Sequence, residues 1–225
     1  MNETWLWLET PPARAAANMA VDEVLLRTAA ERRRPLLRVY SWLRPAVSIG
    51  YFQKFPVHLA DQYDIVRRPT GGGLVYHGDD TTYTVVAPPN HALARMNTAD
   101  AYRAIHRAVA AALGARAHEI VAGRPLPHND VGAIRAYDCF QNPVLGDVMA
   151  DGRKLAGGAQ RRNRHGVLHQ GSIASRITAE QFVDGFSAEL GARFEPYALT
   201  REERALAERL AREKYATVRW NQRVF

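Results

Sequence analysis

Residues 67–77, RRPTGGGLVYH, contain three consecutive glycines that follow a pair of arginines and precede a histidine. Gly71, Gly72 and Gly73 expose backbone N–H groups and allow a ligand to approach the main chain closely. The preceding pair, Arg67–Arg68, can hold an anion such as a carboxylate or a phosphate. The run has neither the Gly-Lys-Ser/Thr ending of a nucleotide P-loop nor the G-x-G-x-x-G pattern. A plain glycine turn is therefore the alternative to a ligand-binding loop.

Strand-like segments lie on both sides of this stretch. The clearest cover residues 36–40, 46–49, 63–66, 83–87, 147–150 and 167–173. Helices are predicted over residues 15–33, over 98–114, after Thr178 and after Thr200, the last two with capping-box spacing to Gln181 and Glu203. The strands cluster and the helices interrupt the clusters. This order predicts an α+β fold with a mixed or antiparallel sheet flanked by helices.

Composition and charge limit the functional classes. The 225 residues carry 30 Lys and Arg against 23 Asp and Glu, a net charge of +7 that favours an acidic partner. The basic residues are spread along the chain, which disfavours a non-catalytic nucleic-acid-binding module. No segment reaches the roughly 20 apolar residues of a membrane helix. The N-terminus has no basic region before its apolar stretch, so we expect a cytoplasmic protein without a signal peptide.

Residues 151–160, DGRKLAGGAQ, contain one of only three lysines in the chain. A tight turn at Asp151–Gly152 would place Lys154 at the start of a strand, and the small residues after it leave room for a ligand. A lysine beside a substrate carbonyl can stabilise developing negative charge or transfer a proton. A hairpin with a solvated Arg-Lys pair is the alternative.

The single cysteine, Cys139, lies in residues 137–143, YDCFQNP. A free cysteine is often a small buried hydrophobe. Reactivity requires the thiolate and therefore a positive neighbourhood, which Lys154, Arg153 or a histidine could provide. Further along, residues 165–173, HGVLHQGSI, alternate as in a strand with polar groups on one face. Their glycines argue against a helix, so the histidines do not predict a zinc pair.

Together these stretches resemble the superfamily of lipoate–protein ligases, octanoyltransferases and biotin–protein ligases. The similar segments are residues 18–23, 37–42, 48–53, 67–77, 151–160 and 169–173, with Lys214-Tyr215 and Trp220-Asn221 near the end. The resemblance implies a single α+β catalytic domain over residues 1–225, of the class II biotin/lipoate synthetase-like type, without a separate accessory domain. It also implies a tunnel for a medium-chain acyl group.

The cysteine-dependent octanoyltransferases with a ligase-type domain are the most similar branch, because Asp138-Cys139-Phe140 resembles their nucleophile segment and residues 82–86 resemble one of their strands. The resemblance implies that Cys139 and Lys154 are catalytic. The substrate-binding residues that it implies are Arg68, Thr70, Gly71, Gly72, Gly73, His77, Gly157, Gly158, Ala159, His169, Gly171 and Ser172. No metal ligand is implied.

We therefore expect an acyltransferase that moves octanoyl from acyl carrier protein through a Cys139 thioester to a lysine of a lipoyl domain or a glycine-cleavage-H-type acceptor. Such an enzyme needs no cofactor, because replacing a thioester by an amide is downhill. Neither nucleic acid nor membrane is expected as a partner, and a monomer is expected. The alternative is an ATP-dependent lipoate–protein ligase that uses ATP and Mg²⁺ to form an acyl-adenylate, with Cys139 as a bystander.

Overall fold

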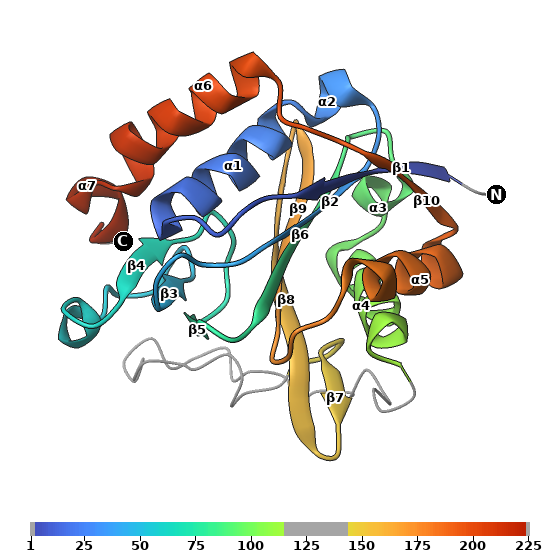
Figure 1. Ribbon diagram of the computed structural model, residues 1–225, viewed down its shortest axis with the longest axis horizontal. Helices are drawn as coiled ribbons and strands as arrows, with labels where there is room; N and C mark the ends of the chain where they lie inside the picture. The colour runs from blue at the N-terminus through green and yellow to red at the C-terminus, as the bar shows by residue number, and fades with distance from the viewer. Residues whose placement is uncertain (1–2, 115–143, 224–225) are drawn as a thin grey trace.

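The computed structural model describes residues 3–114 and 144–223. These residues form a seven-stranded mixed sheet and a smaller three-stranded sheet, with helices on both sides (Figure 1). This arrangement confirms the predicted α+β fold with a mixed sheet flanked by helices.

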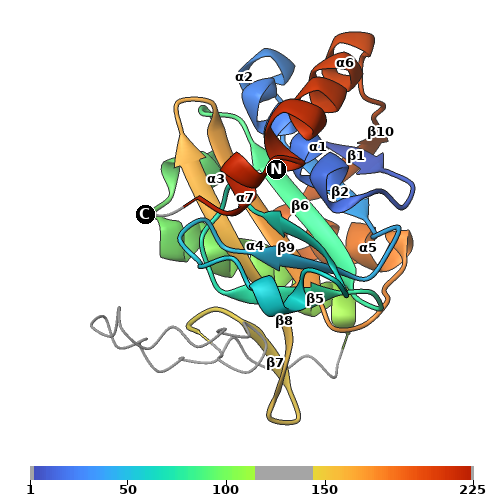
Figure 2. The ribbon, with the colours of Figure 1, turned by 90° about the vertical axis from the view of Figure 1, so that its left-hand side faces the viewer.

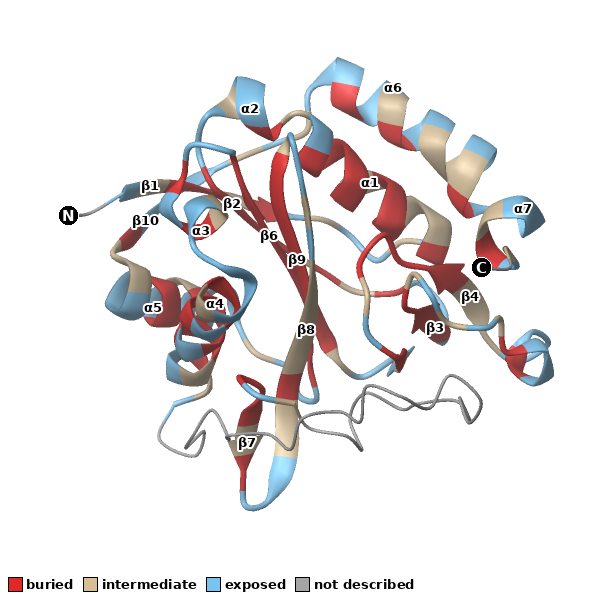
Figure 3. Ribbon diagram, turned by 180° about the vertical axis from the view of Figure 1, so that it is seen from behind, coloured by how far each residue is buried: buried red, intermediate tan, exposed pale blue. Residues whose placement is uncertain are grey.

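The large sheet has the strand order β10-β1-β2-β6-β9-β8-β7. Its strands are β1 (Glu3–Glu9), β2 (Leu36–Tyr40), β6 (Thr81–Ala87), β7 (Val148–Ala150), β8 (Arg153–Asn163), β9 (Gly166–Ile173) and β10 (Ala192–Pro196). β1 runs parallel to its neighbours β2 and β10, and the other neighbouring pairs are antiparallel. β6 and β9 are buried along their length, whereas β8 is mostly half-buried (Figure 3).

The small sheet has the order β4-β3-β5 and lies in front of the large sheet in Figure 2. β3 (Ala46–Ile49) runs parallel to β4 (Asp64–Arg67) and antiparallel to β5 (Leu74–His77). The glycine-rich loop, defined here as residues 68–73, connects β4 to β5. It passes so close to Gly50 that a Cβ at this position would lie 1.8 Å from the Gly72 carbonyl oxygen.

Helices cover the two faces of the large sheet. They are α1 (Ala15–Arg27), α2 (Ala29–Arg32), α3 (Ala92–Arg95), α4 (Thr98–Leu113), α5 (Ala179–Leu190), α6 (Arg201–Leu210) and α7 (Val218–Asn221), with single turns η1 (Val57–Leu59) and the π-helical η2 (Ala211–Tyr215). α4 and α5 pack together on one face, and α1 packs with α6 on the other (Figure 1). No helix in the described ranges is both long and apolar enough to span a membrane.

The large sheet is buried on both faces because successive strand residues point to opposite sides. In β2, Leu37 joins the core formed with α4 and α5, which includes Ile105 and Phe182. Its neighbour Leu36 joins a second core on the α1 side, with Leu25. Burial of a large apolar side chain contributes about 1.5–3 kcal/mol, so these two layers account for much of the stability that holds the site.

Local sequence signals predicted several helix ends correctly, and the structure corrects two of the predictions. Both capping boxes, at Thr178 and at Thr200, are formed. The predicted cap Thr98 is instead the first helical residue, and the side chain of Asn97 caps α4 by accepting from the Asp100 amide. The predicted helix over residues 15–33 is divided at Thr28, whose amide and hydroxyl both donate to the Val24 carbonyl oxygen, a pattern that often bends helices.

Candidate active site

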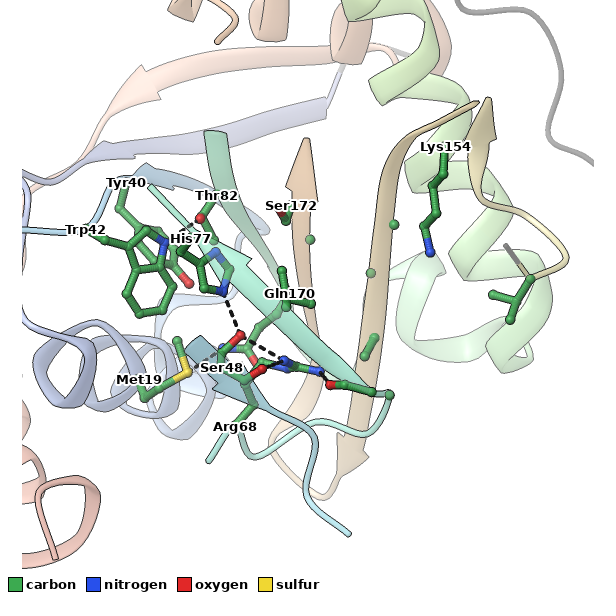
Figure 4. A pocket seen from close by; sticks show the side chains of 18 residues that line it. Met19, Tyr40, Trp42, Ser48, Arg68, His77, Thr82, Lys154, Gln170 and Ser172 are labelled. Carbon is green, nitrogen blue, oxygen red and sulfur yellow. Dashed lines mark hydrogen bonds between the residues drawn. The ribbon is translucent and has the colours of Figure 1, made fainter. Parts of the chain in front are cut away.

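A cavity of about 120 Å³ lies between α1, the small sheet and strands β6, β8 and β9 (Figure 4). Ten of the residues that the sequence assigned to the site line it: Arg68, Gly72, Gly73, His77, Lys154, Gly157, Gly158, Ala159, Gly171 and Ser172. Met19, Tyr40, Trp42, Val75 and Val144 supply much of its apolar surface. The structure therefore brings the glycine-rich loop and the lysine segment to one cavity, although they are far apart in the sequence.

Lys154 lies at one side of this cavity, opposite Trp42 and His77 (Figure 4). It follows the tight turn at Asp151–Gly152, where both residues have positive φ, 49° and 72°, as predicted for a hairpin between β7 and β8. The Lys154 side chain is 5% exposed, and its Nζ lies 2.7 Å from Oδ2 of Asp147. Lys154 is therefore a buried, ion-paired residue rather than a solvated hairpin residue.

Small residues after Lys154 make room for its side chain. A Cβ at Gly157 would lie 2.4 Å from Cε and 2.6 Å from Nζ of Lys154, so the lysine lies directly against this glycine. A Cβ at Gly158 would lie 2.5 Å from Nε2 of His169. The glycine pair of β8 thus accommodates the lysine at one position and a buried histidine at the next.

Arg68 organises the glycine-rich loop. Its guanidinium donates to the Ser48 carbonyl oxygen at 2.7 Å, to Ser48 Oγ at 2.8 Å, and to the carbonyl oxygens of Gly71 and Gly73 at 3.0 and 2.9 Å. The sequence suggested that Arg68 holds an anion. In the structure the guanidinium binds oxygens of its own loop and of β3, and Arg68 lies on the cavity wall beside Gly72 and Gly73.

Arg67 also binds the protein chain. Its guanidinium donates to the carbonyl oxygens of Gly50, Tyr51 and Gln53, and to that of Asn221 at 2.7 Å. The Arg67 amide in turn donates to Oδ1 of Asn221 at 2.8 Å. These bonds give Arg67 a structural role, in which it joins β4 to the C-terminal α7.

The far side of the cavity is a group of polar side chains that satisfy one another. The His77 ring stacks on Trp42, and its Nδ1 lies 2.7 Å from Oδ2 of Asp80. Its Nε2 lies 2.6 Å from Oγ of Ser48. Asp80 Oδ2 also accepts from Ser172 Oγ at 2.7 Å and from Thr82 Oγ1 at 3.0 Å. An apolar chain can approach these groups because their hydrogen-bonding capacity is already used.

The protonation states at this end follow from burial. Burial lowers the pKa of His77, and this effect outweighs the nearby Asp80 carboxylate, so the imidazole is neutral at neutral pH. Burial raises the pKa of Asp80, but hydrogen bonds from His77 and Ser172 outweigh it and leave the carboxyl pKa below its usual value. A neutral histidine therefore donates from Nδ1 to a carboxylate.

Asp22 of α1 holds another part of the cavity wall. Its Oδ1 accepts from Arg38 at 2.6 Å, and its Oδ2 accepts from Tyr40 OH at 3.0 Å and from Gln170 Nε2 at 2.7 Å. Tyr40 and Gln170 both line the cavity. The sequence identified residues 18–23 as a family-like segment but did not assign this role to Asp22.

Three of the predicted substrate-binding residues are not part of the cavity wall. The Thr70 hydroxyl donates at 2.8 Å to Oε1 of Gln170, which lies on the cavity wall. The Gly71 carbonyl oxygen accepts from the Arg68 guanidinium. His169 points to the opposite face of β9, where its ring lies near those of Tyr102 and His106. Burial lowers the pKa of His169 well below its usual value. Cys139, the predicted nucleophile, lies outside the described residues.

Sequence reasoning missed Asp147, which pairs with the lysine, and Tyr102, which donates to Asp147. Asp147 is fully buried, and its Oδ1 accepts from Tyr102 OH at 2.6 Å. Only the predicted strand at residues 147–150 pointed to this region, and nothing local marked Tyr102 as more than a helix core residue. Among residues 3–114 and 144–223, no group of three or more His, Cys, Asp or Glu side chains could hold a metal ion.

A model of the lipoyl protein ligase A/B catalytic domain matches residues 14–208 of this chain. The chain is also similar to curated octanoyltransferases. It is 31% identical to octanoyltransferase LipM of Geobacillus kaustophilus, over 97% of this chain and 98% of that protein. It is 32% identical to octanoyltransferase LipM of Kyrpidia tusciae, over 98% and 99% of the two chains.

Solved structures show the same fold. Lipoate-protein ligase A solved with ATP has a TM-score of 0.74 at 23% identity, with 99% of both chains covered. The bipartite lipoate protein ligase of Thermoplasma acidophilum has a TM-score of 0.73 at 23% identity, covering 99% of this chain and 96% of that one.

Proposed function

This chain belongs to the family of lipoyl protein ligase A/B catalytic domains, and we propose that it transfers octanoyl from acyl carrier protein to a lipoyl-domain lysine through a Cys139 thioester. Its role as an octanoyltransferase of protein lipoylation is supported by curated relatives about 30% identical over nearly the whole chain. The observation that carries the proposal within the molecule is a largely apolar cavity with a buried lysine side chain at one side.

The cavity suits an acyl chain in its chemistry. Trp42, Met19 and Val75 present apolar surface, and glycine backbone forms much of the remaining wall. Burying methylene groups contributes about 0.8 kcal/mol each, or roughly 5 kcal/mol for the chain of an octanoyl group. Lys154 and Trp42 lie on opposite sides, so we place the acyl carbonyl near Lys154 and the terminal methyl near Trp42 (Figure 4).

The transfer occurs in two balanced steps. The Cys139 thiolate attacks the carbonyl of the octanoyl thioester, a new C–S bond forms and the bond to the carrier sulfur breaks. The carrier thiolate leaves and takes up the proton that the cysteine thiol lost. The amine of the acceptor lysine then attacks the Cys139 thioester. A C–N bond forms, the C–S bond breaks, and the cysteine sulfur recovers the proton that the amine loses. Neither step requires a nucleotide.

Lys154 supports both steps from its place on the cavity wall. An ammonium group carries three N–H donors, and one is directed at Asp147. We assign another to the acyl carbonyl oxygen, which becomes negative in each tetrahedral intermediate. The positive charge also favours the thiolate form of a nearby cysteine.

The position of Cys139 in the sequence supports its assignment as nucleophile. It stands a few residues before Val144, which lines the cavity and whose amide donates to Oδ2 of Asp147 at 2.7 Å. Val144, on the cavity wall, thus follows the cysteine closely in the sequence. Because Cys139 is the only cysteine, any thioester on a cysteine must form there.

Partners and compartment belong to the same proposal. Lipoylation enzymes act on lipoyl-domain acceptors, and we assign a lipoyl domain or a glycine-cleavage-H-type protein as the acceptor. The net charge of +7 favours acidic proteins as partners, which increases the rate of encounter. We further propose that the enzyme works as a monomer in the cytoplasm and needs neither ATP nor a metal ion.

The test is to incubate the protein with octanoyl-carrier protein, without ATP, and to measure its intact mass. We expect a gain of one octanoyl group, mapped to Cys139 by peptide mass spectrometry and removed when a lipoyl domain is added. Cys139→Ser should form no hydroxylamine-labile thioester and lose turnover. If no acyl-enzyme forms and Cys139→Ser still lipoylates with ATP and lipoate, the chain is a ligase and the proposal is wrong.

A further inference from the structure

We propose that Asp147 and Tyr102 are positioning residues that hold the Lys154 ammonium at the reacting carbonyl. The inference rests on the proposed function, because it assigns a purpose to a lysine that acts in acyl transfer. Neither residue lines the cavity, so both act through Lys154 rather than by touching the substrate.

Asp147 is placed to hold the lysine in one position. It precedes β7, and Lys154 follows the turn that leads into β8, so the β-hairpin brings the two side chains together. Asp147 is 0% exposed, and its Oδ2 lies 2.7 Å from the lysine Nζ. The same oxygen accepts from the Val144 amide at 2.7 Å, which fixes the carboxylate relative to the chain that precedes it.

Tyr102 fixes the other carboxylate oxygen from a different part of the fold. It projects from α4, and its hydroxyl donates to Oδ1 of Asp147 at 2.6 Å. The same hydroxyl accepts from the Gly158 amide at 3.0 Å. Burial raises the pKa of Tyr102 well above its usual value, and the Asp147 charge adds to this effect, so the hydroxyl keeps its proton. One side chain thus connects α4, the carboxylate and the glycine pair of β8.

Gly157 completes the arrangement. A Cβ there would lie 3.2 Å from Oδ1 of Asp147 as well as 2.6 Å from the lysine Nζ. The carboxylate and the ammonium therefore meet directly over a residue with no side chain. With both oxygens of Asp147 engaged, the ammonium is directed by a rigid partner, as a catalytic group must be to act at a defined carbonyl.

The charge of Asp147 and its hydrogen bonds have separable consequences. A neighbouring carboxylate favours the charged form of a lysine, so removing the negative charge should move the alkaline limb of the pH–rate profile to lower pH. Loss of the Tyr102 hydroxyl keeps the negative charge of Asp147 but removes the hydrogen bond to its Oδ1. That change should lower kcat while leaving the alkaline limb nearly unchanged.

The experiment measures kcat, KM for octanoyl-carrier protein and the pH–rate profile of Asp147→Asn, Asp147→Glu and Tyr102→Phe. For Asp147→Asn we expect kcat to fall about 100-fold, KM to change little, and the alkaline limb to shift to lower pH. Asp147→Glu should have reduced kcat but the wild-type alkaline limb, because it restores the charge. Tyr102→Phe should lose roughly tenfold in kcat, which corresponds to one hydrogen bond.

Matched controls are Asp184→Asn and Tyr76→Phe, because both side chains are exposed and lie outside the cavity wall and the Lys154 pair. Both should retain wild-type kinetics. Thermal melting monitored by circular dichroism identifies any variant that does not fold. If Asp147→Asn is unfolded, the kcat, KM and pH profile of Tyr102→Phe and Asp147→Glu decide the question.

The inference is overturned if folded Asp147→Asn keeps the wild-type kcat and pH profile. It is also overturned if the variant loses kcat/KM entirely through a higher KM, with kcat unchanged. Failure of the proposed function has a different signature. In that case the wild-type protein itself forms no octanoyl amide on a lipoyl domain, or Lys154→Ala is as active as the wild type.

Discussion

The Trp42 indole lies nearly parallel to the His77 imidazole, with ring centroids 4.1 Å apart and an interplanar angle of 19°. Trp42 Nε1 donates to Thr82 Oγ1 at 2.7 Å, which fixes the indole in this orientation. The pair closes the side of the cavity away from Lys154 (Figure 4). Trp42 and Tyr40 also line a depression on their other side, formed with residues such as Thr10 and Ile177. The indole therefore separates the cavity from a second hollow.

Trp42→Ala should change the acyl-chain preference, because it removes the group between the two hollows. We expect kcat/KM for dodecanoyl-carrier protein to rise relative to octanoyl-carrier protein by about tenfold or more. The measurement is a comparison of kcat/KM for octanoyl, decanoyl and dodecanoyl donors. Leu43→Ala is the neighbouring control, because Leu43 is 59% exposed and should leave the preference unchanged. An unchanged preference in Trp42→Ala would show that the chain end lies elsewhere.

Gly157→Ala and Gly171→Ala should separate catalysis from stability. A Cβ at residue 157 meets the flexible end of Lys154 at 2.4 Å, so the lysine can move and the fold can persist. We expect kcat to fall about 100-fold with a small change in stability. A Cβ at residue 171 meets Cζ of the buried Tyr83 ring at 2.2 Å, which should lower the free energy of unfolding by about 1–3 kcal/mol.

Urea unfolding and steady-state kinetics on the same preparations measure both effects. Gly71→Ala is the control, because a Cβ at that position meets nothing within 4 Å. It should match the wild type in stability. Equal losses of stability in the variants at residues 157 and 171 would contradict the distinction between a mobile and a fixed neighbour.

Stability should decline as the pH falls from about 6.5 toward 4. Burial lowers the pKa of His106 from 6.5 to about 4, and burial also lowers those of His77 and His169. In this range the unfolded chain binds protons that the folded chain does not, so the free energy of unfolding decreases with decreasing pH. His106 alone would contribute roughly 3 kcal/mol to the loss.

Urea midpoints at pH 7 and pH 5 provide the measurement. His106→Leu should reduce the difference between the two midpoints, whatever its effect on absolute stability. His58→Gln is the control, because His58 is exposed and should leave the difference unchanged. The burial argument for His106 fails if the difference is the same in His106→Leu as in the wild type.

Asn221→Ala should destabilise the junction between the C-terminal segment and β4. Asn221 Oδ1 accepts from the Arg67 amide at 2.8 Å, and its Nδ2 donates to the Tyr215 carbonyl oxygen at 2.7 Å. Removing the side chain leaves a buried amide without this acceptor, which costs about 1–3 kcal/mol. Chemical denaturation of Asn221→Ala beside the exposed control Asn90→Ala measures the loss. Equal midpoints in the two variants would contradict this role.

Local sequence determined those features whose free energy is local. The capping boxes at Thr178 and Thr200 depend on residues three positions apart, and the Asp151–Gly152 turn depends on two adjacent residues, so each was predictable. Strand β8 was only partly predictable, because its AGGA segment lacks the β-branched and aromatic residues typical of strands. Strands β1 and β10 were not predicted; they pair with each other across the chain, and β1 also pairs with β2.

In the candidate site, too, some features were predictable from the sequence and others were visible only in the tertiary structure. The glycine-rich loop, Lys154 and Cys139 were identified from motifs in the sequence alone, and Cys139 still depends on that inference. Only the tertiary structure showed that Arg68 binds its own loop and that His169 points away from the cavity. Only the tertiary structure showed that Tyr102 contacts Asp147, which pairs with Lys154. Contacts between a helix and a hairpin depend on packing and on strand register. Those are properties of the whole fold, and no local pattern of residues encodes them.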